Sequence, residues 1–170
     1  MNAIPAPLSR RPLDVVFIVF WAINFGFITY MIDIEQIDIP DPAHFTYPIW
    51  PPRFAVDAIH WWSRSFDPVV WNRAPWYRAT IWIDSLIFGP FYLFAMRAFW
   101  KGKRWIRIPA FVWSGMMIAI VTIILFEEFW GSTPTASPGL VFAANLPWLL
   151  FPLGVIARML REDPFAPGRD

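Results

Sequence analysis

The chain reads ATIWIDSLIFGPFYLFAM from Ala79 to Met96. Apart from Thr80, Ser85, Asp84 and the pair Gly89-Pro90, this stretch is apolar and long enough to cross a hydrocarbon core of roughly 30 Å. A carboxyl group therefore stands in the middle of a segment that belongs in a membrane. A charge at that depth costs about 2.5–3.5 kcal/mol on insertion scales, so an acid placed there usually has a function. The surroundings of Asp84 are the main question that the sequence raises.

Three further runs have the length and hydropathy of a spanning helix, at 15–32, 108–126 and 139–157. Hydrophobic residues make up 57% of the 170 residues and charged residues only 16%, which is too apolar for an ordinary soluble domain. Four buried helices of a soluble bundle would need polar faces, and these runs lack them. The sequence predicts an all-α integral membrane protein, a four-transmembrane-helix bundle forming one domain over 1–170, with helices at about 14–32, 76–97, 106–127 and 139–160.

Basic residues orient these helices. Two arginines precede the first helix, Arg158 and Arg161 follow the fourth, and the connection 97–107 carries five bases and no acid. The connection 127–138 carries two acids and no base. Because positively charged connections stay cytoplasmic, we expect both termini on the cytoplasmic side. Arginine outnumbers lysine by twelve to two, which weakly favours a bacterial inner membrane over the endoplasmic reticulum.

The first connection is long and contains a helical pattern of its own. After several prolines, four polar residues recur at intervals of four, three and four: Arg53, Asp57, His60 and Arg64. Apolar, largely aromatic side chains fill most of the positions between them. This spacing predicts an amphipathic helix at about 52–66, opened by Pro52 and lying on the outer interface. We expect its polar stripe, including His60, to face water.

Composition excludes several kinds of site. The absence of cysteine excludes disulfides and thiolate metal sites. A net charge of +1 offers no electrostatic footprint for nucleic acid. His44 and His60 both lie outside the spanning runs, so a haem or chlorophyll held by an intramembrane histidine is not expected. The sequence predicts no metal and no cofactor.

The predicted topology brings side chains of several helices to one depth. Asp84 lies about 12 Å below Trp76, and Asn145 lies about 9 Å below Gly139 with Trp148 at i+3, at 1.5 Å per residue. Six side chains can meet in the outer half of the bundle, and we expect them to bind a ligand: Asp33, Asp84, Thr122, Glu127, Asn145 and Trp148. Such a pocket would suit a lipophilic molecule with one positive charge, because the acid is a counter-charge and the indole face attracts cations.

Each of these residues also has a structural interpretation. Asp84 would lock two helices together if it paired with an arginine, and Asn145 would add about 0.6–2 kcal/mol as an interhelical hydrogen bond. Trp148 can serve as packing alone, and Asp33 as an interfacial charge at a helix end. These alternatives are open at the level of sequence.

Two further acidic positions stand on the outer side. Asp67 precedes Pro68, and we predict a structural role for it in building a turn. Of the two adjacent glutamates at the end of the third run, we expect Glu127 rather than Glu128 to point inward.

Several motifs, in this order and spacing, resemble the EXPERA family, which includes a sigma-2 receptor type and an emopamil-binding type, a sterol isomerase. The resemblance covers about 13–160. The matching stretches are Met31-Ile32-Asp33, Phe66-Asp67-Pro68, Trp76-Tyr77-Arg78 followed by Asp84 and Gly89-Pro90, AFWKGKRWIRIPA from Ala98 to Ala110, LFEEF from Leu125 to Phe129, and NLPWLLFP from Asn145 to Pro152.

The resemblance implies a four-helix membrane protein, often dimeric, with an intramembrane pocket. In the receptor type, acids matching Asp33 and Asp84 engage the amine of lipophilic cationic ligands, and the acid matching Asp67 supports them. In the isomerase type, residues matching Asp84, Asn145 and Trp148 serve a site that protonates a sterol double bond, which would make Asp84 catalytic. Cationic amines bind there because they imitate the carbocation. The isomerase type also carries a histidine and a glutamate in its first helix, and the stretch 21–29 has neither.

Three functions are therefore compatible with the sequence. The first is a binding protein for a sterol-like or isoprenoid lipid and hydrophobic amines, surrounded by membrane lipids. The second is a lipid double-bond isomerase that works by protonation and deprotonation. The third is an accessory subunit of a larger membrane complex. We expect a homodimer and no nucleic-acid partner.

Overall fold

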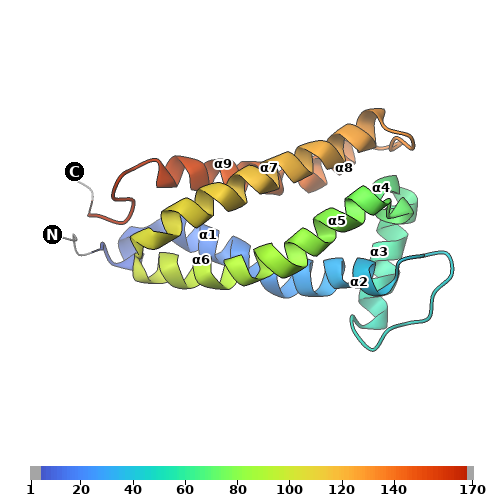
Figure 1. The fold of residues 1–170 in the computed structure, drawn as a ribbon, viewed down its shortest axis with the longest axis horizontal. Helices are drawn as coiled ribbons and strands as arrows, with labels where there is room; N and C mark the ends of the chain where they lie inside the picture. The colour runs from blue at the N-terminus through green and yellow to red at the C-terminus, as the bar shows by residue number, and fades with distance from the viewer. Residues whose placement is uncertain (1–4, 168–170) are drawn as a thin grey trace.

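The computed structural model of the protein describes residues 5–167, and within this range the chain contains helices and no strand. Four helical segments are long and apolar enough to span a membrane: Pro12–Asp38, Pro75–Lys101, Arg104–Trp130 and Pro138–Met159. The prediction of an all-α, multi-pass integral membrane protein is confirmed. Both ends of the described chain and the turn between the second and third spans lie at one end of the bundle (Figure 1).

The spans are assembled from shorter helices. The first contains α1 (Pro12–Ile23), the π-helical segment η2 (Asn24–Asp33) and α2 (Ile34–Asp38), and follows the 3-10 turn η1 (Leu8–Arg10). The other three contain α5 (Pro75–Ile83), the π-helical η3 (Asp84–Phe88) and α6 (Gly89–Lys101), then the 3-10 turn η4 (Arg104–Ile106) and α7 (Arg107–Trp130), then α8 (Pro138–Asn145) and α9 (Pro147–Met159). Proline begins α1, α5, α8 and α9, because it lacks the N–H that a first helical residue leaves unpaired.

The helices pair into two layers that close on each other near the chain ends. α1 packs against α6, and α7 packs against α9 (Figure 1). An aromatic core joins the layers there, where the ring of Trp21 lies 4.7 Å from that of Phe99 and 5.9 Å from that of Trp113, centroid to centroid. These rings are edge-on to one another, the arrangement that aromatic pairs favour. The opposite half of the bundle contains the pocket described below.

The π-helical turn η3 has an identifiable cause. The Gly89 N–H bonds to the carbonyl of Asp84, five residues back, and Pro90 has no N–H to give. The carbonyl of Ser85 therefore has no helical partner, and the hydroxyl of Tyr30 donates to it at 3.1 Å. Glycine permits this approach, since a Cβ at position 89 would lie 2.5 Å from Tyr30 Oη. The first and second spans are thereby joined at the residue that follows Asp84.

The first connection contains α3 (Arg53–Ser65) and α4 (Pro68–Asn72). The predicted helix at 52–66 is present, but the expectation that His60 faces water is wrong. His60 is buried, and its Nε2 lies 2.8 Å from Glu35 Oε1. Arg73 also donates to both oxygens of Glu35, at 3.1 and 2.8 Å. This buried group fastens α3 and the end of α4 to α2.

Candidate functional site

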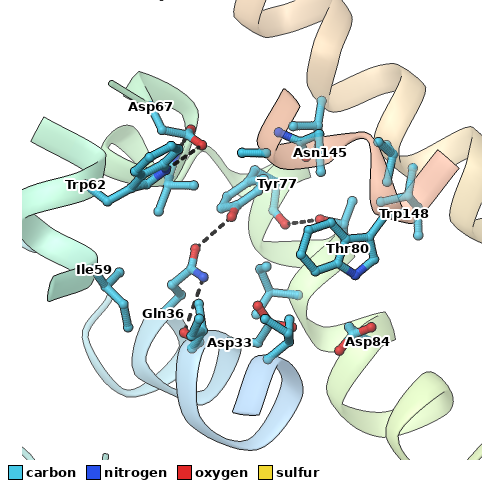
Figure 2. Close-up of a pocket in the computed structure, with 18 of the residues that line it drawn as sticks. Asp33, Gln36, Ile59, Trp62, Asp67, Tyr77, Thr80, Asp84, Asn145 and Trp148 are labelled. Atoms are coloured by element: carbon cyan, nitrogen blue, oxygen red, sulfur yellow. Dashed lines mark hydrogen bonds between the residues drawn. The ribbon is translucent and has the colours of Figure 1, made fainter. Parts of the chain in front are cut away.

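A cavity of about 500 Å³ lies between the two layers, roofed by α3. Its walls are mostly aliphatic and aromatic, and they come from η2, α2, α3, α4, α5, η3, α7 and the α8–α9 junction. Polar side chains are few among the lining residues, and Figure 2 shows most of them: Asp33, Gln36, Asp67, Tyr77, Thr80, Asp84 and Asn145. A pocket of this size and character is typical of sites for lipophilic small molecules.

Asp33 and Asp84 form a pair of carboxyl groups on this cavity. Both side chains line the cavity and, although they come from different spans, they lie close enough for each to influence the ionisation of the other. Thr29 Oγ1 donates a hydrogen bond to Asp84 Oδ2, and Tyr92 Oη donates to Asp84 Oδ1 at 3.1 Å. Among residues 5–167 no lysine, arginine or histidine forms an ion pair with either acid. The pair therefore faces the cavity without a protein cation.

Trp148 forms the wall beside this pair (Figure 2). Its indole Nε1 donates to Asn24 Oδ1 at 2.7 Å, and Asn24 Nδ2 donates to the carbonyl of Phe20 at 2.8 Å. The ring is thus held by a buried amide on the first span. Asn145 also lines the cavity, while its Nδ2 donates to the carbonyl of Val141 at 2.9 Å. Its amide oxygen is left to accept a hydrogen bond.

Asp67 lies toward the other side of the cavity, next to Trp62 (Figure 2). Its Oδ1 accepts the Val70 N–H at 3.0 Å and caps α4, and its Oδ2 accepts from Trp62 Nε1 at 3.3 Å. Between the two acidic regions, Tyr77 Oη donates to Gln36 Oε1 at 2.8 Å. The cavity therefore has a row of polar groups along otherwise apolar walls.

Comparison with known proteins places the chain among its relatives. The model of the family described as EBP: EXPERA (EXPanded EBP superfamily) matches residues 54–159. The chain belongs to the EXPERA family. Sigma intracellular receptor 2 of Xenopus tropicalis is 31% identical over 164 residues, which cover 90% of this chain and 91% of the relative. The protein of the same name from Homo sapiens is 25% identical over 171 residues, covering 92% of each chain.

Two residues that sequence reasoning assigned to the EXPERA pocket lie outside it. Thr122 is exposed on the outer face of α7, and its hydroxyl donates to the carbonyl of Ile118 at 2.7 Å. Glu127 bonds at the helix end, where its Oε1 accepts from Ser132 N at 2.9 Å and from Ser132 Oγ at 3.0 Å. Neither side chain lines the cavity, because each projects from α7 in a direction different from that of its buried face.

Glu128, not Glu127, is the glutamate that points into the EXPERA fold. It is fully buried, its Oε1 accepts the Val69 N–H at 3.0 Å, and its carboxyl group lies near that of Asp67. Sequence spacing contains the signal for this placement. The buried residues of α7 recur every three or four positions, and Glu128 continues the series Ala110, Trp113, Met117, Val121 and Leu125.

Sequence reasoning also missed the residues that support the acid pair and the indole. Thr29 lies four residues before Asp33, and Tyr92 lies eight residues after Asp84. Helical spacing therefore places Thr29 on the same face as Asp33, and Tyr92 on the same face as Asp84. Asn24 had no such signal, because its partner Trp148 is 124 positions away.

Proposed function

We propose that this EXPERA protein binds a sterol-like or isoprenoid lipid, and lipophilic cationic amines, in its intramembrane cavity. The observation that carries the proposal is the Asp33–Asp84 pair, which faces a largely apolar cavity of about 500 Å³ and has no basic partner in the described chain. Membrane acids normally pair with one another or with backbone groups, and they mark ligand or ion sites.

The charge of the pair suits one ammonium group. Neighbouring carboxyl groups in an apolar site disfavour ionisation of both, so in this proposal the pair keeps one proton and carries one negative charge. Asp84 is the better holder of that charge, because Thr29 and Tyr92 both donate to it. An amine placed there would also face Trp148, whose ring attracts cations.

The rest of the cavity suits a neutral, mostly hydrocarbon body. The walls are apolar, and the hydroxyl of Tyr77 with the amides of Gln36 and Asn145 supply hydrogen-bonding groups away from the acid pair. A ring or chain lipid with a single hydroxyl group fits this distribution. The names of the relatives, which denote receptors, support a binding role for this chain as well.

A cavity-filling substitution tests the proposal. Ala144 lines the cavity, whereas Ala143, the residue before it on α8, is exposed on the outer surface and does not. Ala144→Trp should abolish binding of a fluorescent sterol and its displacement by a hydrophobic amine, and Ala143→Trp should leave both intact. Equal binding by the parent and both folded variants would show that the cavity is not the site.

The acid pair also supports a second candidate, a double-bond isomerase. A carboxylic acid and a carboxylate in contact are a proton donor and a proton acceptor at one place, the minimum for moving a proton between two carbons. Incubation with candidate sterols in deuterated water tests this function, since protonation at carbon leaves deuterium in the product. Unlabelled lipid after prolonged incubation would exclude the reaction for the lipids used.

A further inference from the structure

A second cavity, of about 750 Å³, lies at the end of the bundle that carries the chain ends. Three segments that are distant in sequence form it: Pro5, the α6–α7 turn at 101–108, and residues 162–165. Gly102 ends α6 with a φ of 61°, and a Cβ there would collide with Pro5. Six charged side chains line the cavity: Lys101, Lys103, Arg104, Arg107, Glu162 and Asp163.

Two of the four bases are fixed by the C-terminal segment. Arg107 Nε donates to the carbonyl of Met159 at 2.7 Å. Arg104 Nη2 donates to the carbonyl of Glu162 at 3.0 Å, and its Nε lies 3.7 Å from Asp163 Oδ1. These contacts hold the turn against the C-terminal segment and give the cavity its shape.

Lys101 and Lys103 remain available. Both are exposed, and neither forms an ion pair within residues 5–167. The lining as a whole has two more positive than negative side chains. An anion is therefore the ligand that this cavity attracts.

The cavity borders the surface that faces lipid. Trp105 and Ile108 belong to its lining and are 55% and 73% exposed, and Trp100, four residues before Arg104, is 64% exposed. Indole rings at the ends of spanning helices sit at the level of the lipid headgroups. An anion bound here would lie at the depth of the lipid phosphates, with basic side chains on one side of it and acyl chains on the other.

We propose that this cavity binds the phosphate of an anionic phospholipid. Lys101 and Lys103 contact the phosphate, and the acyl chains run along Trp105 and Ile108. A basic connection whose only role is to set the orientation of its helices needs no cavity. This connection instead lines a concave site whose shape Arg104 and Arg107 fix. The site is separate from the acid-pair cavity, so the proposal does not depend on the ligand of that cavity.

Native mass spectrometry of the whole protein in neutral detergent tests the proposal, with phosphatidylglycerol, phosphatidylcholine and inorganic phosphate as separate probes. The parent should retain one phosphatidylglycerol in preference to phosphatidylcholine. Lys101→Gln with Lys103→Gln should weaken that binding about 25-fold, since each lysine near anionic lipid contributes a factor of roughly five. Arg97→Gln with Arg161→Gln is the matched control, because both arginines are exposed, removing them removes the same charge, and neither lines the cavity.

Three results would overturn the proposal. Equal retention of phosphatidylglycerol and phosphatidylcholine would show that the headgroup charge is not recognised. An equal loss in the lysine and arginine variants would show general surface attraction instead of a site. Displacement of the lipid by millimolar inorganic phosphate would assign the cavity to the free anion. Unchanged melting temperatures of both variants would show that the comparison is between folded proteins.

Discussion

Removing both acids of the Asp33–Asp84 pair should selectively weaken the binding of amines. We consider Asp33→Asn with Asp84→Asn, which keeps the size and most of the hydrogen bonding of both side chains but removes the one negative charge. Two unit charges about 4 Å apart interact by about 4 kcal/mol at an effective dielectric constant of 20. Part of this is offset by dehydration of the ammonium, so we expect a net loss of about 2–4 kcal/mol, a rise in Kd of roughly 30- to 1,000-fold.

Each single substitution should reduce the affinity for amines less than the double substitution does. If the pair carries a single negative charge, as proposed above, the acid that remains in Asp33→Asn or Asp84→Asn can carry it. Asp84→Asn should be the more damaging of the two, because Asp84 accepts from Thr29 and Tyr92 and Asp33 would have to ionise without those donors. The two single losses should therefore not add up to the loss in the double variant.

The assay is displacement of a labelled hydrophobic amine from purified protein, repeated with an analogue in which carbon replaces the amine nitrogen. The neutral analogue should bind the parent and all three variants with similar affinity. Parent-like amine binding by the double variant would refute the counter-ion argument. A loss of the same size for the neutral analogue would instead mean that the cavity had collapsed, and the charge would then explain nothing.

The remaining predictions concern the residues that support the site. Asn24→Leu removes the acceptor of the Trp148 indole, so amine affinity should fall by about fivefold and the tryptophan emission should shift in a fluorescence spectrum. Arg73→Met leaves the buried Glu35 without its bidentate partner and should destabilise the protein by about 3–5 kcal/mol, seen as a lower midpoint in chemical denaturation. Gly89→Ala puts a methyl group 2.5 Å from Tyr30 Oη and should cost about 1–3 kcal/mol in the same assay.

Each of these substitutions has a matched control in the chain. Asn145→Leu removes a cavity amide that does not hold Trp148, so it should not shift the tryptophan emission. Arg64→Met acts on an exposed arginine of α3 and should change stability little. Gly115→Ala places its methyl group where no atom lies within 4 Å, and should be neutral or slightly stabilising. Effects of equal size in a variant and its control would refute the corresponding assignment.

The depth of each site residue along the bundle could be predicted from the sequence, but the direction in which its side chain points could not. Counting residues from the helix ends placed Asp84, Asn145 and Trp148 at one level, and the structure puts all three on the cavity. The same count put Thr122 on that level, although it points away from the bundle. In a soluble helix the apolar stripe would reveal the inner face. Here the lipid-facing residues Val112, Ile123 and Phe126 are as apolar as the buried ones.

The polar stripe of α3 shows a related limit. The spacing of polar residues correctly predicted a helix at this place, since the helix runs from Arg53 to Ser65. It did not predict that His60 would be buried, because a polar face can meet a polar cluster as well as water. The partners, Glu35 and Arg73, lie 25 positions before it and 13 after it, and only the fold brings them together.

The buried acids of the chain differ in whether an arginine neutralises them. Asp14, fully buried on α1, accepts from Arg11 Nη1 at 2.7 Å and from Arg158 Nε and Nη2 at 2.7 and 3.0 Å. Glu35 is likewise neutralised by Arg73. Asp14 and Glu35 are thus neutralised by arginine, whereas the buried acids Glu128 and Asp67 form no ion pair within residues 5–167.

Asp33 and Asp84 differ from Asp14 and Glu35 in this respect. Asp33 and Asp84 have hydroxyl groups and each other as neighbours, and the described chain brings no arginine to them. The cost of keeping a carboxylate away from water is the same in both places, so the missing cation needs another source. A positively charged ligand, or the charge that develops on a protonated double bond, would supply it from the cavity side.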